Sequence, residues 1–190
     1  MGHGMAGSAT KLTYDDFALL PDDGQRHELI DGEHHVTPSP GRRHQTISMS
    51  LARLIATFLH TERLGRIYHA PFDVHLTPHD VVEPDLLYVS REREAILTEA
   101  NVQGAPDLAI EILSPFSRNV DELRKRDLYE RSGVREYWIV DPEAEAVKVF
   151  RRGAEGGFGR PELLTLRLDD RLTTPLMPGL ELPLGEVFAE

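Results

Sequence analysis

One ten-residue stretch, PDLAIEILSP at residues 106–115, constrains the fold of this chain more than any other segment. Its apolar run is typical of a β-strand that is covered on both faces of a sheet. Glu111 interrupts the run, and an ionised carboxylate there loses its hydration at a high cost unless a cation, hydrogen-bond donors or a metal replaces the water. The stretch therefore predicts a buried strand whose glutamate faces a partner.

The segments before this strand predict a short helix, a hairpin and a longer helix. Thr13 with two acids after it is typical of a helix N-terminus, and Asp31-Gly32 inside HELIDGEHHV is a strong signal for a two-residue turn. Residues 44–64 repeat apolar side chains at helical spacing, and Gly65 is expected to close that helix. RIYHAPFDVHLTP and EPDLLYVS then read as two strands.

The segments after the strand continue the alternation of helix and strand. Residues 117–131 predict a helix that ends at Gly133, and EYWIVDP with AVKVFRR predicts another hairpin-like pair. A glycine-rich loop, a weaker strand and an irregular tail are expected to follow. The fold class that these segments predict is α/β, with a central mixed β-sheet flanked by helices.

Length and composition favour one ordinary globular domain. Of the 190 residues, 1–10 are predicted to be a disordered leader and 11–190 a single domain. The chain has no cysteine, which excludes disulfides and thiolate metal sites. No apolar segment approaches the ~20 residues that span a membrane, and no signal-peptide pattern opens the chain, so a cytoplasmic protein is expected.

The net charge of −11 argues against a general affinity for nucleic acid, because proteins that bind phosphate backbones are usually basic. Two segments depart from this acidity. Residues 42–66 hold five arginines and two histidines against one acid, and residues 118–135 hold six basic residues against four acids. These segments are either phosphate contacts or ordinary solvated helix faces, and the sequence leaves both interpretations open.

A second acid completes a candidate metal site. Alternation along a strand places Asp107 and Glu111 on one face, and the preceding strand carries Asp85 in the motif EPD. If the two strands are neighbours, Asp85 and Glu111 meet, and two close carboxylates repel unless a cation lies between them. Oxygen ligands suit Mg²⁺ or Mn²⁺. The alternative is an ion pair between Glu111 and one of the eighteen arginines, and Asp107 is expected to be a strand-entry residue first.

Lys125 is unusual for this chain, which has only three lysines. Where only positive charge is needed the chain uses arginine, whereas a lysine can tune its proton when it is partly desolvated. A lysine near a metal can orient the attacking water or stabilise charge on a phosphate. The alternative is an exposed lysine among other helix charges.

Four segments in a fixed order resemble a known family. They are HELIDGE at 27–33, EPD at 83–85, PDLAIEILSP at 106–115 and DELRKRDLYERSGVREYWIVDP at 121–142. Together they are similar to the restriction-endonuclease-like family of small bacterial proteins, formerly a domain of unknown function, within the PD-(D/E)XK nuclease superfamily. The resemblance covers about residues 12–152.

The resemblance implies a site. The superfamily pattern is an acid followed by acid-x-lysine on the next strand; its acids match Asp85 and Glu111, as catalytic residues and metal ligands. The lysine position is Leu113 in this chain, a departure, and Lys125 matches a lysine relocated to the following helix. The resemblance also implies a contribution from the N-terminal part, for which Glu28 and His44 are the candidates.

The function expected from these residues is that of a Mg²⁺- or Mn²⁺-dependent DNA endonuclease that hydrolyses phosphodiester bonds. A homodimer is expected because cleavage of two strands needs two such sites. The alternative is a non-catalytic module that binds nucleic acid or protein on a degenerate nuclease fold. A hydrolase of smaller phosphate esters is a third possibility. The histidines lack the helical spacing of a zinc site.

Overall fold

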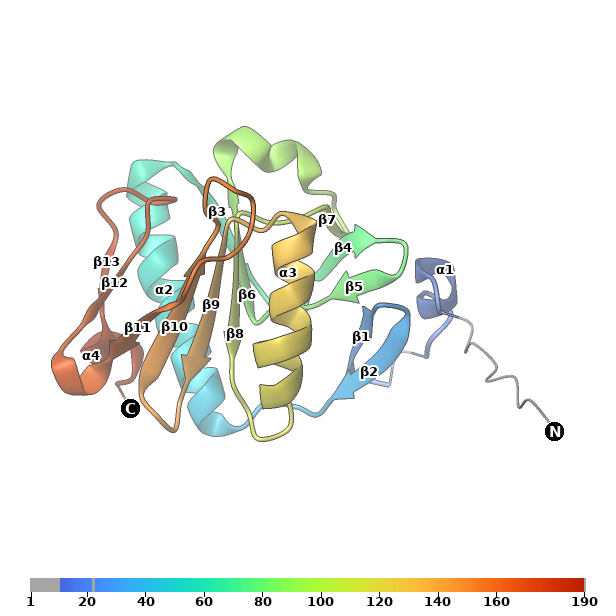
Figure 1. Ribbon diagram of the computed structural model, residues 1–190, viewed down its shortest axis with the longest axis horizontal. Helices are drawn as coiled ribbons and strands as arrows, with labels where there is room; N and C mark the ends of the chain where they lie inside the picture. The colour runs from blue at the N-terminus through green and yellow to red at the C-terminus, as the bar shows by residue number, and fades with distance from the viewer. Residues whose placement is uncertain (1–10, 22, 190) are drawn as a thin grey trace.

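The computed structural model describes residues 11–21 and 23–189, so the predicted leader over 1–10 lies outside the described residues. A six-stranded sheet forms the centre, with the order β11-β10-β9-β8-β6-β3 (Figure 1). Its strands are β3 (Gly65–His69), β6 (Leu86–Ser90), β8 (Leu108–Ile112), β9 (Glu136–Asp141), β10 (Ala146–Arg151) and β11 (Glu162–Thr165). β8 and β9 run parallel and the other neighbours antiparallel, which confirms the predicted mixed sheet.

β8 lies in the middle of this sheet and is buried along its whole length. Leu108, Ile110 and Ile112 pack into the core on one face, whereas Ala109 and Leu113 pack into the core on the other. This is the alternation that a pleated strand imposes. Glu111 therefore points to the same side as Ala109 and Leu113, as predicted.

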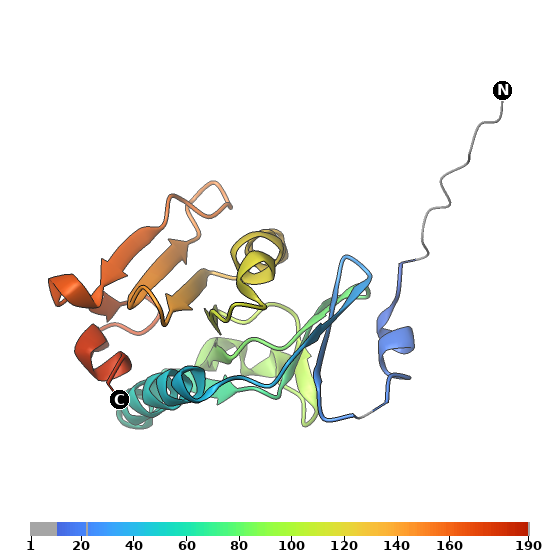
Figure 2. The same cartoon turned by 90° about the horizontal axis from the view of Figure 1, so that it is seen from below.

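Helices cover both faces of the sheet (Figure 2). α2 (Arg42–Glu62) buries a row of apolar residues four positions apart, which are Ile47, Leu51, Ile55 and Leu59. On the opposite face, a π-helical turn, η2 (Val120–Lys125), continues directly into α3 (Arg126–Ser132). Gly133 ends this helix with a φ of 92°, as the sequence predicts.

A second, five-stranded sheet packs on the α3 side of the molecule, where it shares a core with β6 and β8. Its order is β2-β1-β5-β4-β7. The strands are β1 (Arg26–Ile30), β2 (Glu33–Thr37), β4 (Asp73–Thr77), β5 (Asp80–Val82) and β7 (Asn101–Gln103). The hairpin of β1 and β2 turns at Asp31-Gly32, as predicted.

The chain completes its core with short elements. They are α1 (Tyr14–Phe17), the 3₁₀ turns η1 (Arg91–Ile96) and η3 (Leu166–Leu168), the strand pair β12 (Arg171–Thr173) and β13 (Glu181–Pro183), and α4 (Leu184–Val187). None of the described helices is long and apolar enough to cross a membrane.

Three predictions about these elements were wrong. α2 is closed by Arg63 in the left-handed conformation, not by Gly65, which begins β3. A Cβ on Gly65 would lie 2.3 Å from the backbone oxygen of Val89, so the glycine permits the close approach of β3 to β6. The run at 66–78 is two strands in different sheets, and the tail is ordered, with Leu172 and Met177 fully buried against the face that α2 covers.

Candidate active site

The five predicted site residues come together at the ends of β1, β6 and β8. β6 and β8 are antiparallel neighbours, and Leu86 pairs with Ile110, so Asp85 at the start of β6 lies beside the glutamate of β8. Asp85, Glu111, His44 and Lys125 line one pocket of about 330 Å³, and Glu28 contacts the lysine. The pocket opens between residues 37–41 and residues 114–117.

Lys125 lies at the bottom of the pocket with its ammonium surrounded by acids. Its Nζ is 2.8 Å from Glu28 Oε1, 2.9 Å from Glu111 Oε1 and 3.6 Å from Asp121 Oδ1. Burial alone would lower the pKa of Lys125, but the three carboxylates outweigh it and raise this pKa well above its usual value. Lys125 is therefore a permanent buried cation, and the alternative of an exposed helix lysine is wrong.

Glu111 is fully buried, and its hydrogen bonds converge on one oxygen. Oε1 accepts from Lys125 Nζ and from the hydroxyl of Tyr129, at 2.9 Å each. Burial raises the pKa of Glu111 well above its usual value, and Asp121 and Asp85 add to this rise while Lys125 opposes it. The carboxylate is thus held in an environment that disfavours its negative charge, as expected for a buried acid whose charge is only partly balanced by nearby cations.

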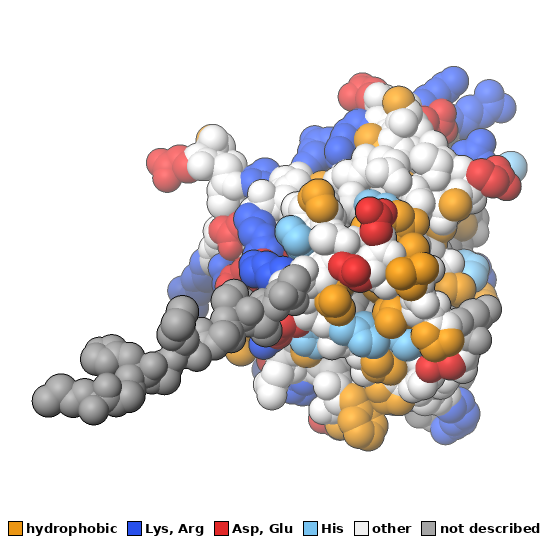
Figure 3. Space-filling model, turned by 90° about the vertical axis from the view of Figure 1, so that its right-hand side faces the viewer, with side chains coloured by type: hydrophobic (Ala, Val, Ile, Leu, Met, Phe, Trp, Pro, Cys, Tyr) orange, Lys and Arg blue, Asp and Glu red, His pale blue; other side chains and the backbone are white. Residues whose placement is uncertain are grey.

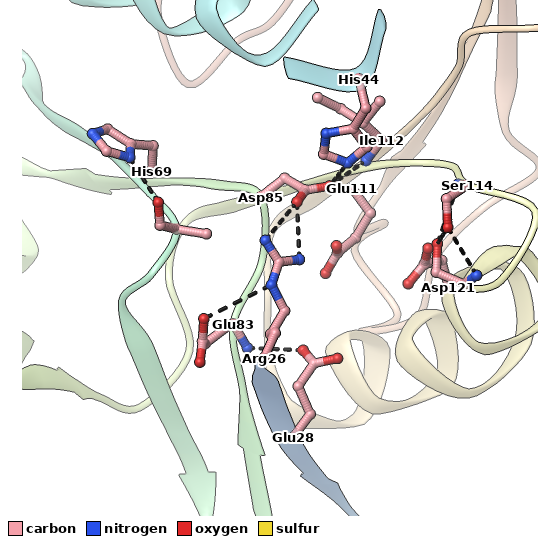
Figure 4. Close-up of polar contacts among 12 residues, drawn as sticks. Arg26, Glu28, His44, His69, Glu83, Asp85, Glu111, Ile112, Ser114 and Asp121 are labelled. Atoms are coloured by element: carbon pink, nitrogen blue, oxygen red, sulfur yellow. Dashed lines mark hydrogen bonds and ion pairs between the residues drawn. The ribbon is translucent and has the colours of Figure 1, made fainter. Parts of the chain in front are cut away.

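Asp85 is held in its ionised form, in contrast to Glu111, because hydrogen-bond donors surround it. Both terminal nitrogens of Arg26 lie 2.9 Å from Oδ1, and Oδ2 accepts from the backbone N–H of Ile112 at 2.8 Å (Figure 4). His44 Nε2 lies 3.0 Å from the same Oδ2. Burial would raise the pKa of Asp85, but these donors lower it to about 2. Asp85 is therefore ionised at any physiological pH.

Two residues of the cluster were not predicted, Arg26 and Asp121. Arg26 is two positions before Glu28 on β1, so both side chains point to the same face, and strand alternation could have identified it. Asp121 is four positions before Lys125 in the same helix, which places the two on one side. Burial raises the pKa of Asp121 to about 6.

The charges of this cluster do not balance. Glu28, Asp85, Glu111 and Asp121 are each at most 4% exposed. They face Lys125 and Arg26, so four carboxyl groups lie against two cationic side chains. Protons or a further cation must compensate such an excess in a buried site.

The sequence of this chain matches the Uma2 family, described as "Putative restriction endonuclease", over residues 14–185. The chain belongs to the Uma2 family. The family description supports a nuclease-like function. The predicted family is thereby confirmed.

A solved structure shares the fold of this Uma2 chain. It is a nuclease described as "putative" and as belonging to DUF820, from Anabaena variabilis ATCC 29413. The TM-score is 0.79 at 22% sequence identity, and the match covers 94% of this chain and 98% of the other. The likeness confirms the predicted restriction-endonuclease-like α/β fold. No match was found among curated proteins.

The donor set of the Uma2 site fits a hard divalent cation in chemistry and in charge. Four carboxylates supply oxygen ligands of the kind that Mg²⁺ and Mn²⁺ prefer, and a charge of +2 would balance the excess. Within residues 11–21 and 23–189, however, no group of three or more acids or histidines is arranged around a common metal position. The ammonium of Lys125 lies at the centre of the acids instead.

The basic segment at 118–135 is largely neutralised by neighbouring acids. Its five arginines each pair with at least one carboxylate; they are Arg118, Arg124, Arg126, Arg131 and Arg135. The pocket lining contains one arginine, Arg26, and no arginine of either basic segment. Arg42 follows the pocket-lining Gly41, is exposed and has no acidic partner in the described part of the chain.

Asp107 and the described histidines other than His44 are not among the residues that line the pocket. Asp107 accepts the backbone N–H of Ser90 and pairs with arginines, as expected of a strand-entry residue. Several histidine side chains are visible on the face of the molecule shown in Figure 3. On the first hairpin, the rings of His27 and His34 stack 5.1 Å apart, and His27 also contacts Asp23.

Proposed function

We propose that this chain is a metal-dependent DNA endonuclease that hydrolyses phosphodiester bonds, with Asp85 and Glu111 as ligands of Mg²⁺ or Mn²⁺. The observation that carries the proposal is a buried cluster with more carboxyl groups than cationic side chains, one of them a lysine, in a chain of a restriction endonuclease family. A structural ion-pair cluster would be expected to balance its charges, because each unpaired buried charge destabilises the fold.

The side chains of the pocket have different roles in the proposed reaction. Asp85 is kept ionised by Arg26, His44 and the amide of Ile112, and a cation that binds this carboxylate would displace one of these donors. Glu111 uses one oxygen for Lys125 and Tyr129. Its other oxygen has no hydrogen bond within the described part of the chain and remains available as a ligand.

Lys125 is the proposed positioning and charge-stabilising group. Its ammonium is held against Glu111 by Glu28 and Asp121, at a place where it can donate a hydrogen bond to an attacking water or a phosphate oxygen. A bound divalent ion would supply Lewis-acid polarisation of the phosphate and a lowered pKa for that water. Glu28 acts through the lysine, and His44 through Asp85.

The net charge of −11 implies weak non-specific binding, so we propose a narrow class of DNA target. A homodimer in the cytoplasm, with one site for each strand, completes the proposal. Size-exclusion chromatography with light scattering tests the dimer: a mass near 43 kDa, about twice that of the 21.4 kDa chain, is expected.

The second candidate is a non-catalytic binding module. It is favoured by the pairing of Asp85 with Arg26 and by the position of Lys125 among three carboxylates, since both contacts occupy groups that a nuclease would use. An acidic module of this kind would be expected to bind without a metal requirement.

Thermal melts with and without millimolar Mn²⁺ separate the two candidates. A metal at about 100 times its dissociation constant adds ~2.7 kcal/mol, which is a shift of several degrees. We expect this shift in the wild type and in Glu136→Gln, and no shift in Glu111→Gln. Glu136 is the matched control, because it is a buried strand glutamate of the same sheet that lies outside the pocket. Equal shifts in all three proteins, or none in any, would favour the module.

Cleavage of supercoiled plasmid tests the lysine. Lys125→Arg keeps the charge but not the compact shape, so we expect the rate to fall at least tenfold, about 1.4 kcal/mol in barrier. Lys148→Arg is the control, since Lys148 pairs with Glu122 at the surface. Equal rates for the wild type and Lys125→Arg would remove the lysine from the mechanism.

A further inference from the structure

Phe116 is an exposed aromatic residue at the mouth of the candidate active site. Its side chain is 78% exposed, whereas every other Phe, Tyr and Trp of the described chain is buried or half-buried. It lines the same pocket as Asp85, Glu111 and Lys125. A single exposed apolar residue needs no explanation by itself. An exposed aromatic ring at the entrance of a charged pocket, however, can contact a molecule that enters this pocket.

The loop that carries Phe116 is fixed by local hydrogen bonds. Ser114 and Ser117 bond each other through their hydroxyls at 3.0 Å, and the backbone N–H of Ser117 donates to Ser114 Oγ at 3.1 Å. Pro115 restricts the backbone between them. The next turn begins at once, because the N–H of Asp121 donates to the carbonyl oxygen of Ser117. The ring is thus presented to solvent by an ordered turn, where it loses the burial that an apolar side chain prefers.

The connection between β2 and α2 adds further apolar side chains to the pocket lining. Pro38 and Pro40 of this connection line the pocket beside the polar Thr37 and Ser39. The lining also holds charged groups that are buried or half-buried, including Lys125 and Arg26. An aromatic ring and prolines next to charged groups complement a nucleotide, which carries a flat π-face at one end and a phosphate at the other.

We infer that Phe116 stacks on an unpaired nucleobase of the substrate strand, next to the phosphodiester that enters the pocket. The inference rests on the proposed function and specifies its substrate class. In continuous duplex DNA the neighbouring bases cover both faces of each base, so a protein ring stacks only where a base is unstacked. The substrate is therefore a single strand or a locally opened duplex, rather than a continuous duplex.

This substrate class agrees with the charge of the protein. Stacking on an aromatic side chain contributes to binding without phosphate contacts and is tolerant of sequence. An acidic protein with few unpaired arginines near its site would gain affinity in this way, and continuous duplexes, which offer mainly backbone charge, would bind poorly.

Fluorescence anisotropy with three labelled probes tests the inference. The probes are a single-stranded DNA 15-mer, a hairpin duplex of the same sequence, and a strand of the same length built wholly from abasic residues. Ca²⁺ replaces Mn²⁺ so that binding is measured without cleavage. The proteins are the wild type, Phe116→Ala, Phe116→Trp and the control Leu163→Ala, which truncates an exposed apolar residue on β11, away from the pocket.

We expect the wild type to bind the base-bearing strand about tenfold more tightly than the duplex or the abasic strand. Phe116→Ala should lose this preference and bind the other two probes as the wild type does. Phe116→Trp should restore the preference, because tryptophan also offers a stacking face. Leu163→Ala should match the wild type on every probe.

The inference is overturned if Phe116→Ala discriminates among the three probes as the wild type does. In that case Mn²⁺-dependent cleavage of plasmid by the wild type would show that the proposed function still stands. Wild-type protein that neither binds any probe nor cleaves any DNA would overturn both proposals together.

Discussion

At the scale of single residues, the central feature is one ammonium held among three acids. Lys125 contacts Glu28, Glu111 and Asp121, and each of these four residues is at most 2% exposed. Removal of one partner from a buried ionic group is strongly destabilising, because the remaining charges are left uncompensated. The same lysine that is proposed to assist hydrolysis is therefore also a structural residue.

Lys125→Met should lower the free energy of unfolding by about 3–5 kcal/mol at pH 7.5. The loss of stability should be smaller at pH 5.5, since the carboxylates left without a cationic partner can then take up protons. Urea denaturation at the two pH values measures both effects. Lys148→Met is the control and should cost at most about 1 kcal/mol, as expected for a partly exposed ion pair. If Lys125→Met were as stable as the wild type at pH 7.5, the structural role of the lysine would be refuted.

The metal-free protein should lose the contribution of Asp121 to its stability as the pH rises from 4 to 7. The pKa of Asp121 is raised from 3.8 to about 6 by burial, so the folded state binds more protons than the unfolded state between these values. The contribution of this group is complete below the unfolded pKa and is lost as the pH rises through about 6. Asp85 has the opposite sign, and its contribution is lost only as the pH falls from about 4 towards 2.

Mn²⁺ should counteract this loss, because a metal binds the deprotonated acids. The increase in Tm caused by Mn²⁺ should grow between pH 5 and pH 7.5. Melting curves of the wild type and Asp121→Asn test both effects, and the variant should show a flatter pH dependence without metal. An identical pH dependence of Tm for the wild type and Asp121→Asn in the absence of metal would contradict the direction of the Asp121 shift.

At the scale of secondary-structure elements, local sequence patterns explain the parts that were predicted. The hairpin at Asp31-Gly32, the apolar row of α2 and the alternation along β8 each follow from a repeat within one segment. The C-terminal elements have no such repeat. β12 and β13 are three residues long, and their burial depends on contacts with segments far away in the sequence.

Truncation of a C-terminal core residue tests how far this tail stabilises the fold. Leu172 on β12 is fully buried, so Leu172→Ala should lower the free energy of unfolding by about 2–5 kcal/mol through lost burial and a cavity. Leu168→Ala, at a position that is 61% exposed, should change it by less than about 0.5 kcal/mol. Urea denaturation measures both, and equal values would show that the tail does not contribute to the core.

At the scale of the whole molecule, the site is assembled from distant parts of the chain. Asp85, Glu111 and Lys125 could be predicted together because each is a polar residue that interrupts a pattern in its own segment or in the usage of the chain. Strand alternation places Arg26 on the face of Glu28, but its pairing with Asp85 could not be predicted, since the two are 59 residues apart and only the arrangement of the two sheets brings them together. Among the ion pairs that neutralise the segment at 118–135, those of Arg124 with Glu33 and Arg131 with Asp80 are also long in range.

This neutralisation predicts a weak salt dependence of DNA binding. With few unpaired arginines near the pocket, the slope of log K against log[salt] should be no steeper than about −3. Arg42→Ala should reduce it by about one and weaken binding of all sequences similarly. Arg167→Ala is the control, because Arg167 is also exposed without an acidic partner in the described chain but lies on η3. DNA-binding titrations at several salt concentrations measure this slope, and a value near −8 would contradict the prediction.

The position of Lys125 between the two sheets limits how this site can change in evolution. Glu28 belongs to the five-stranded sheet and Glu111 to the six-stranded sheet, so one ammonium joins both sheets to the helix that carries it. Any substitution selected for a different chemistry at this lysine also weakens the contact between the sheets. A descendant of this chain can therefore exchange its lysine only if the other contacts between the sheets, the pair of Arg26 with Asp85 and the shared apolar core, suffice to hold them together.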